Sequence, residues 1–265
     1  MVNSAEISLL SGKFLIGAMI FIRILAMMAI APIFKNPAII TQHKIFLAVI
    51  LAVGVTSVYW TEQPTLEVHL WYLALLVLKE FMVGFALGFA ANMIFYAARF
   101  AGGIIDFDMG YQASQMFDPT IGAPTLVGEI KDLATLMLFI AIDGHHYLIQ
   151  GIYLSMKAVP ITTFAVTGST VEMLISFVTS VFIIAIKMAA PVLVALFATN
   201  LALALLARVA PQTNIFILSF QLKVIVGLIV LFLSVPLFVL VTKTALLGMQ
   251  DELYQFVMTL NPARV

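Results

Sequence analysis

The chain has 265 residues, of which 63% are hydrophobic and only 10% are charged. Soluble domains carry roughly 25% charged residues, so this composition indicates an integral membrane protein. The 13 Lys and Arg residues balance the 13 Asp and Glu residues, which argues against a basic nucleic-acid-binding face, and the absence of cysteine excludes disulfides and cysteine-based metal or redox sites.

The first apolar run, residues 14–33, has the length of a helix that crosses a bilayer. A cleaved signal peptide has a shorter apolar core and a more basic start, so we expect a retained helix. Arg23 lies in the middle of this run and should contact protein or water, because a charge in lipid is costly. The next uncharged run, residues 45–60, is short for a complete crossing.

A third apolar segment, residues 70–98, contains the adjacent pair Lys79 and Glu80. Neighbours in sequence do not face each other on a helix, so each should meet a group on another helix. Gly84 and Gly88 have the spacing that lets a second helix approach closely, although this motif also occurs by chance in apolar helices. Asn92 lies two turns beyond Gly84 on the same side and is placed to hydrogen-bond across such a contact.

Residues 102–128 contain five glycines, two prolines and three aspartates within an otherwise apolar chain. Gly110 permits positive φ and Pro119 forbids continuous helix. Irregular backbone cannot face lipid, because its N–H and C=O groups lack partners there. The segment is therefore expected to close a pore, with the neighbouring helices as the wall. The alternative is an ordinary extramembrane loop, against which its large apolar side chains argue.

The apolar segment 133–156 is interrupted at Asp143-Gly144-His145-His146. Adjacent histidines project about 100° apart on a helix, and no further ligand stands at metal-site spacing. We therefore expect no metal or other cofactor here, and interpret the four residues as a polar helix end or turn. The polar residues 160–170 are the best internal boundary of the chain.

Residues 171–207 form an apolar run whose only charges are Glu172 and Lys187. As one helix they would be about 55 Å long, against a hydrocarbon core of about 30 Å. The segment should therefore either break near Pro191 or run on past the membrane. A polar turn at residues 208–214 and a second apolar run, residues 215–242, predict an antiparallel helical hairpin. The tail 251–265 is mildly amphipathic.

The sequence NLALALLARVAPQTNIF, residues 200–216, resembles the signature of the FliR family of flagellar export-gate proteins, whose counterpart in virulence secretion is SctT. Met109-Gly110 with residues 117–119, and residues 143–145, resemble two further landmarks of that family in the same order. The resemblance covers nearly the whole chain. Gln221 departs from it, because the family usually has proline at this position. The signature residues are Asn200, Arg208, Pro211, Gln212 and Asn214.

The resemblance implies an all-α integral membrane protein of the bacterial inner membrane, in the flagellar basal body. It implies a FliP-like part at residues 1–160, followed by a FliQ-like helical hairpin at residues 161–265. The plug loop of the family falls on residues 103–121 here. Its expected plug residues are Gly103, Phe107, Met109, Gly110, Met116, Phe117, Asp118 and Pro119.

The expected function is that of a non-enzymatic channel subunit, through which unfolded proteins pass and which helps to close the pore at rest. The implied partners are FliP-like and FliQ-like membrane subunits and other proteins of the export apparatus. An ion-coupled secondary transporter is the alternative. It would use a charge relay and two matching helix interruptions, of which the sequence offers one. The relay residues would be Arg23, Lys79, Glu80, Asp106 and Lys187.

Overall fold

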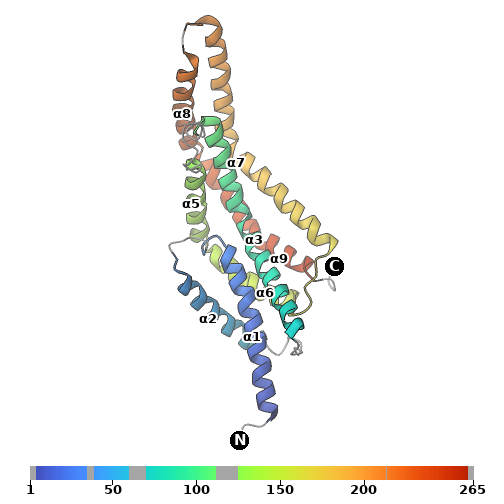
Figure 1. The fold of residues 1–265 in the computed structure, drawn as a ribbon. Helices are drawn as coiled ribbons and strands as arrows, with labels where there is room; N and C mark the ends of the chain where they lie inside the picture. Colours follow the sequence, from blue (N-terminus) through green and yellow to red (C-terminus); the bar gives the residue numbers. More distant parts are fainter. Residues whose placement is uncertain (1–3, 35–38, 60–69, 112–124, 213, 262–265) are drawn as a thin grey trace. The chain divides into compact units, whose positions relative to one another are not determined.

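The computed structural model describes residues 4–34, 39–59, 70–111, 125–212 and 214–261. Within these ranges the regular structure is entirely α-helical, which confirms the expected all-α class. The helices, labelled in Figure 1, are α1 (Ser4–Ile30), α2 (Thr41–Tyr59), α3 (Leu70–Met109), α5 (Leu126–Ala141), α6 (Gly144–Ala158), α7 (Gly168–Val209), α8 (Ile215–Leu233) and α9 (Val235–Thr259).

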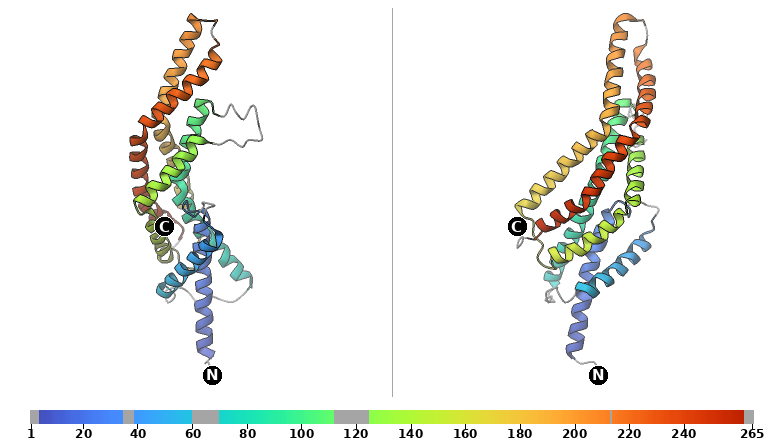
Figure 2. Two further views of the ribbon diagram at one scale, coloured as in Figure 1. Left: turned by 90° about the vertical axis from the view of Figure 1, so that its left-hand side faces the viewer. Right: turned by 180° about the vertical axis from the view of Figure 1, so that it is seen from behind.

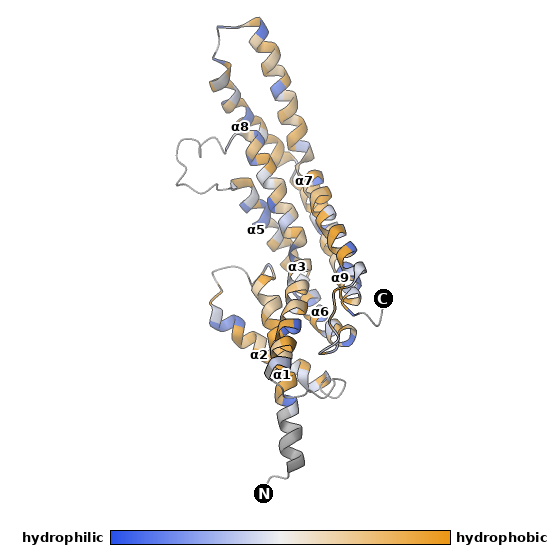
Figure 3. Cartoon of the chain, turned by 45° about the vertical axis from the view of Figure 1, so that its right-hand side comes forward, coloured by the Kyte–Doolittle hydropathy of each residue, from blue (hydrophilic) through white to orange (hydrophobic). Residues whose placement is uncertain are grey.

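Among the described residues, four helices are long and apolar enough to cross a membrane, namely α1, α2, α3 and α7. The helices α8 and α9 form a bent pair, with an angle of 55° between them, which would make a fifth span if counted as one. Hydrophobic residues cover most of the length of α7 (Figure 3). The membrane class expected from composition is therefore confirmed.

The chain divides into two compact units. The first comprises residues 1–93, 143–177 and 248–265, and so contains α1, α2, α6 and the first part of α3. Its core includes the C-terminal end of α9, where the Phe256 ring meets the Phe177 ring edge-on with their centroids 5.2 Å apart. Residues 251–259 of the amphipathic tail are thus helical, with a buried face formed by Leu253, Phe256 and Val257.

The second unit comprises residues 94–142 and 178–247. Its core joins the last part of α3 to α5, α7 and the α8–α9 region. Small residues on α3 and α7 let the helices pack closely. The two views in Figure 2 show α7 and α8 running side by side from their connecting turn, as the sequence predicted for the hairpin. The core residues are Ala97, Ala98, Ala101, Ile105, Met109, Val127, Ala185, Met188, Ala189, Val192, Leu196 and Phe238.

Helix α3 continues further than expected, because the glycine-rich stretch is helical as far as Met109. Ala101, Ile105 and Met109 follow one another at helical spacing and are all fully buried in the core of the second unit. Burial of this face outweighs the low helix propensity of the two glycines beside it. The expectation of irregular backbone from residue 102 is therefore wrong for residues 102–109.

The end of α3 is a Schellman motif centred on Gly110, whose φ is +86°. The N–H of Gly110 donates to the carbonyl of Phe107, and the N–H of Tyr111 donates to that of Asp106. A residue with a side chain rarely adopts this left-handed conformation, so a glycine is suited to this position. The helix therefore ends at a glycine that adopts positive φ.

Helix α7 runs unbroken for 42 residues, about 63 Å, with Pro191 inside it. Of the two alternatives drawn from the sequence, the continuous helix is correct. Val192, beside the proline, and Leu196, one turn beyond it, are fully buried, so packing compensates for the backbone hydrogen bond that proline cannot make.

The single helix expected over residues 215–242 is wrong, because α8 ends at Leu233 and α9 begins at Val235. Pro236 has no N–H and its ring clashes with the preceding turn, which accounts for the 55° bend. The Oγ of Ser234 donates to the carbonyl of Leu231 at the break. By contrast, α8 is regular at Gln221, so the chain has no irregularity where the family usually has proline.

Candidate functional site

The two helices that flank residues 112–124 are tied together at their ends. The carboxylate of Asp106, near the end of α3, accepts hydrogen bonds from the backbone N–H of Val127 at 3.1 and 3.2 Å, and from that of Gly128 at 3.4 Å. The first N–H groups of a helix lack intrahelical partners, and the helix dipole favours a negative charge beside them. Asp106 thus serves α5 as a cap from a distant part of the chain.

The backbones of α3 and α5 also touch directly. A Cβ atom added to Gly102 would overlap the backbone N and Cα of Gly128, which no small adjustment of a side chain could relieve. Only glycine fits at this contact. We call Gly102, Asp106, Val127 and Gly128 together the anchored base, because they fix both ends of the segment between α3 and α5.

The last turn of α3 packs against α8. Met109 is fully buried, and its side chain lies so close to Gly227 that a Cβ there would come within 2.8 Å of the sulfur. A Cβ on Gly110 would come within 3.3 Å of the Phe220 ring. Phe107, in contrast, is 69% exposed. The end of α3 is thus held against α8.

The expected plug residues therefore fall into two groups. Gly103, Phe107 and Met109 belong to α3, and Gly110 forms the turn that ends it. The other four, Met116, Phe117, Asp118 and Pro119, lie outside the described residues. The re-entrant form of the loop and its plug role stay predictions.

Helix α5 carries two charges near the anchored base that the sequence reading missed. Lys131 is 5% exposed, and its ammonium lies 4.3 Å from the centroid of the Phe238 ring. Burial lowers the pKa of Lys131 to about 8. A signal was present, because Val127, Lys131 and Thr135 follow at helical spacing on the buried face of α5. The second charge on α5, Asp132, accepts a hydrogen bond of 2.6 Å from Arg99.

In the first unit, Arg23 and Glu80 are both completely buried and form an ion pair of 2.6 Å. Arg23 also donates to the carbonyls of Ser155 and Val159, each at 3.0 Å, and so satisfies the C-terminal end of α6. Arg23 thus contacts protein, and Glu80 meets a group on another helix. The second carboxylate oxygen of Glu80 has no hydrogen-bond partner among the described residues.

The other two expected buried charges differ from this pair. Lys79 donates to the carbonyl of Thr162 at 3.0 Å and is only partly buried. Lys187 is exposed in this chain, because it projects away from the core face of α7 that carries Met188, Ala189 and Val192. Its expected burial is therefore not found within the chain itself.

Gly84 and Gly88 give the close helix contact that their spacing predicted, and the approaching helix is α1 of the same chain. A Cβ on Gly84 would overlap the carbonyl oxygen of Arg23, and one on Gly88 would come within 2.7 Å of that of Met27. The Asn92 side chain donates to the carbonyl of Ile30 at 3.2 Å, across the same contact.

The signature residues 200–214 lie at the end of α7 and in the turn that leads into α8. Arg208 occupies the last turn of α7, where a positive charge complements the helix dipole. Pro211 and Gln212 are exposed in the turn, and Asn214 precedes the first residue of α8. Asn200 lies on α7, two turns before Arg208.

Asp143 lies in the turn between α5 and α6, and His145 and His146 lie in the first turn of α6, which agrees with the expected polar helix end or turn. Asp143 adopts a left-handed conformation with φ 58°, and the two imidazole rings are 4.2 Å apart. Their possible donor atoms lie within 4.8 Å of one another, closer than the sequence argument allowed. The group stands at the N-terminus of α6, where the helix dipole disfavours a cation.

The family model described as "Bacterial export proteins, family 1" matches residues 14–249. The chain belongs to this family. The resemblance drawn from residues 200–216 is therefore confirmed.

Three curated relatives illustrate the range of this export family. "Flagellar biosynthetic protein FliR" of Bacillus subtilis is 34% identical over 230 residues, which cover 85% of this chain and 88% of the relative. The protein of the same name in Escherichia coli is 30% identical, covering 82% of each. "Yop proteins translocation protein T" of Yersinia pestis is 30% identical over 164 residues, covering 61% of this chain and 63% of the relative.

Proposed function

We propose that this chain is the FliR-like channel subunit of a flagellar type III protein export apparatus in the bacterial inner membrane, where its glycine-rich segment closes the pore at rest. Membership of the export family and the names of the relatives support the export role, which is structural rather than enzymatic. The membrane-spanning helices support the location. The anchored base is the observation that carries the proposed closure.

The anchored base gives the closing segment fixed ends. Asp106 and the contact between Gly102 and Gly128 hold α3 against α5. This part of the sequence contains Met116 and Phe117, whose large apolar side chains suit a seal against ions. Such side chains also yield to many different polypeptides, because their contacts require no fixed hydrogen-bond geometry.

The proposed partners are FliP-like and FliQ-like membrane subunits. Helix α7 is about twice as long as a bilayer core is thick, so much of it needs partners other than lipid. It exposes large apolar side chains along its length, and an apolar surface of this kind marks an interaction site. Examples are Val194, Phe197, Leu201 and Leu205. The proposed likeness of residues 1–160 to FliP and of residues 161–265 to FliQ would fit such an assembly, although the two compact units follow a different division.

The transporter alternative has no support in the contacts of its proposed relay residues. Arg23 and Glu80 are engaged with each other and with helix ends, and Asp106 is engaged with backbone N–H groups. Their role in the described structure is to join helices.

The closure is tested by photo-crosslinking in cells that carry an export substrate stalled by a folded fusion domain. A photoreactive phenylalanine analogue replaces Phe117, and a matched control carries it at Phe46, which is 67% exposed on α2. We expect the stalled substrate to crosslink at position 117 and not at position 46. Equal crosslinking at both positions, or none at 117, would contradict the proposal.

A further inference from the structure

Three side chains that can each ligate a metal lie together at the start of α6, within the first unit. A carboxylate oxygen of Asp143 and one ring nitrogen each of His145 and His146 lie within 4.8 Å of one another. The centroids of the two imidazole rings are 4.2 Å apart, and Nδ1 of His146 is 4.0 Å from Oδ1 of Asp143. The sequence argument against a metal assumed that adjacent histidines diverge on a helix, whereas these two rings meet.

The carboxylate of Asp143 does not cap the helix that it precedes. An aspartate at the N-cap usually accepts a hydrogen bond from one of the first N–H groups of its helix. Asp143 occupies this position in a left-handed conformation, and its side chain makes no capping hydrogen bond. The backbone N–H of His146 donates to the carbonyl of Asp143 at 2.9 Å, which keeps the two residues side by side. Their side chains are 60% and 72% exposed, so an ion in solution can reach them.

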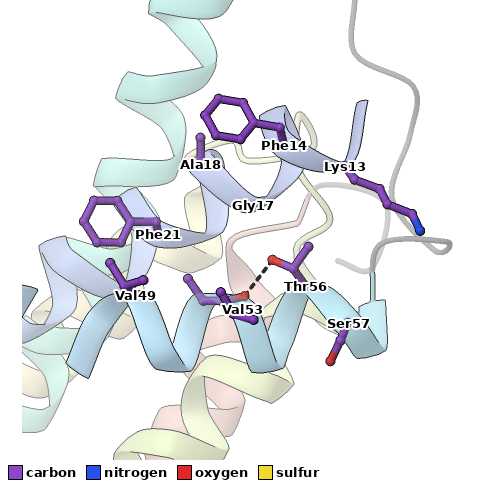
Figure 4. Close-up of a pocket in the computed structure, with 10 residues that line it drawn as sticks. Lys13, Phe14, Gly17, Ala18, Phe21, Val49, Val53, Thr56 and Ser57 are labelled. Atoms are coloured by element: carbon purple, nitrogen blue, oxygen red, sulfur yellow. Dashed lines mark hydrogen bonds between the residues drawn. The ribbon is translucent and has the colours of Figure 1, made fainter. Parts of the chain in front are cut away.

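A groove of about 700 Å³ between α1 and α2, in the same unit, has no such set of ligands among the described residues that line it (Figure 4). Its lining is mostly apolar. Its two hydroxyl groups are engaged within α2, since Thr56 and Ser57 donate to backbone carbonyls at 2.6 and 2.7 Å. The ligands that an ion requires are therefore found at the start of α6 and not in this groove.

Two imidazole nitrogens and one carboxylate oxygen are the donor set of several zinc enzymes, in which water completes the tetrahedron. The ligand atoms lie about 2.1 Å from such an ion, and so roughly 3.4 Å from one another. Rotation of the exposed side chains about their χ angles reduces the present separations to this value. We propose that Asp143, His145 and His146 bind a divalent transition-metal ion, with zinc as the ion that best fits this donor set. This inference is independent of the export role proposed above.

The N-terminal position on α6 does not prevent such binding. The helix dipole disfavours a cation there, but at an exposed site its effect is small, is screened by salt and falls off within one turn. Asp143 places a full negative charge at the same point, which opposes the partial positive charge of the helix end. Histidine binds a metal in its neutral form, so the two rings add no positive charge to the occupied site.

The test is isothermal titration calorimetry of the full chain, without an affinity tag, in detergent and with zinc chloride as the titrant. We expect saturable binding of one zinc ion per chain. His145→Gln, His146→Gln and Asp143→Asn should each weaken this binding by about tenfold or more, because even the loss of a group that only supports a metal ligand has an effect of that size. His43→Gln is the matched control, since it removes an exposed histidine of α2 outside the cluster and should bind zinc like the wild type.

Two further measurements separate coordination by these side chains from nonspecific attraction. Cobalt(II) in place of zinc should give the visible absorption of a tetrahedral site in the wild type and not in His146→Gln. Zinc should raise the unfolding temperature of the wild type and not that of the variants, because a ligand of the folded state stabilises it. Without zinc the variants should unfold like the wild type, which shows that they fold. No saturable binding by the wild type, or binding that His145→Gln and His146→Gln leave unchanged, would overturn the proposal.

Discussion

The carboxylate of Asp106 accepts the backbone N–H of Val127, a residue that is far along the chain and on the other side of the glycine-rich segment. This contact joins the last turns of α3 to the first turn of α5. It therefore holds the end of α3 beside the start of α5. The proposed closure therefore depends on Asp106, a buried residue of α3 that the sequence alone places in the glycine-rich segment.

Replacement of Asp106 by leucine should lower the free energy of unfolding by about 2 kcal/mol, because it removes a charged acceptor from N–H groups that have no other partner. Asp106→Asn keeps one acceptor oxygen and should lower the free energy of unfolding by less. Thermal unfolding of the detergent-solubilised protein measures both effects. Asp108→Asn, two residues away, is the control and should change little. Equal stability of the leucine variant and the wild type would show that the carboxylate does not hold α5.

Gly84→Leu should prevent α1 from docking on α3, because even a Cβ overlaps the carbonyl oxygen of Arg23. Overpacking of this kind costs 1–3 kcal/mol or more, and here backbone atoms would have to move. The expected result is a lower yield of folded protein and a lower unfolding temperature. Gly12→Leu on α1 meets nothing within 4 Å and should behave as wild type. A stable Gly84→Leu variant would contradict the described contact.

For the buried ion pair of Arg23 and Glu80, removal of one partner should destabilise the protein more than removal of both. Arg23→Met alone leaves a buried carboxylate without its partner and should cost about 3–5 kcal/mol of stability. Arg23→Met combined with Glu80→Leu should recover much of that loss, since no uncompensated charge remains. Chemical denaturation of the single and double variants measures the difference. Lys187→Met, at an exposed lysine, is the matched control, and a double variant as unstable as the single one would refute the argument.

Burial of Lys131 should make the stability of the protein depend on pH. Its pKa is lowered to about 8 in the folded chain from 10.5. Between these values the unfolded state holds the proton more often than the folded state, so this lysine makes stability rise with pH through that window. Below pH 8 its burial costs up to about 3 kcal/mol, partly offset by the Phe238 ring. Lys131→Met should therefore stabilise the protein at pH 7 by more than at pH 10. A difference that does not vary with pH would contradict the assignment.

Helix pattern and spacing predicted much of the fold. The runs around Arg23 and Gly84 were recognisable as helices, and the GxxxG spacing did give a close approach. The prediction that each glycine or proline interrupts a helix was less successful. Gly102 and Gly103 are helical because the neighbouring Ala101 and Ile105 are buried in a core that the local sequence does not reveal. Pro191 is tolerated for the same reason, whereas Pro236 bends the chain.

The candidate site was predicted only in part. The family resemblance implies a plug at residues 103–121, whereas the observed contact between Asp106 and Gly128 joins α3 to α5 across the chain. Such a contact depends on how α3 and α5 pack, and no spacing rule relates the two positions. Lys131 could have been found from its position on the apolar face of α5, because its neighbours at helical spacing are buried.

The most direct test of the closure is the ion conductance of the assembled export gate in a planar bilayer. Residues 113–120 are replaced by a glycine–serine sequence of equal length, which leaves the anchored base intact. We predict that the assembled complex then conducts ions at rest, whereas the wild-type complex does not. If both complexes assemble and their resting conductance is the same, the glycine-rich segment does not close the pore.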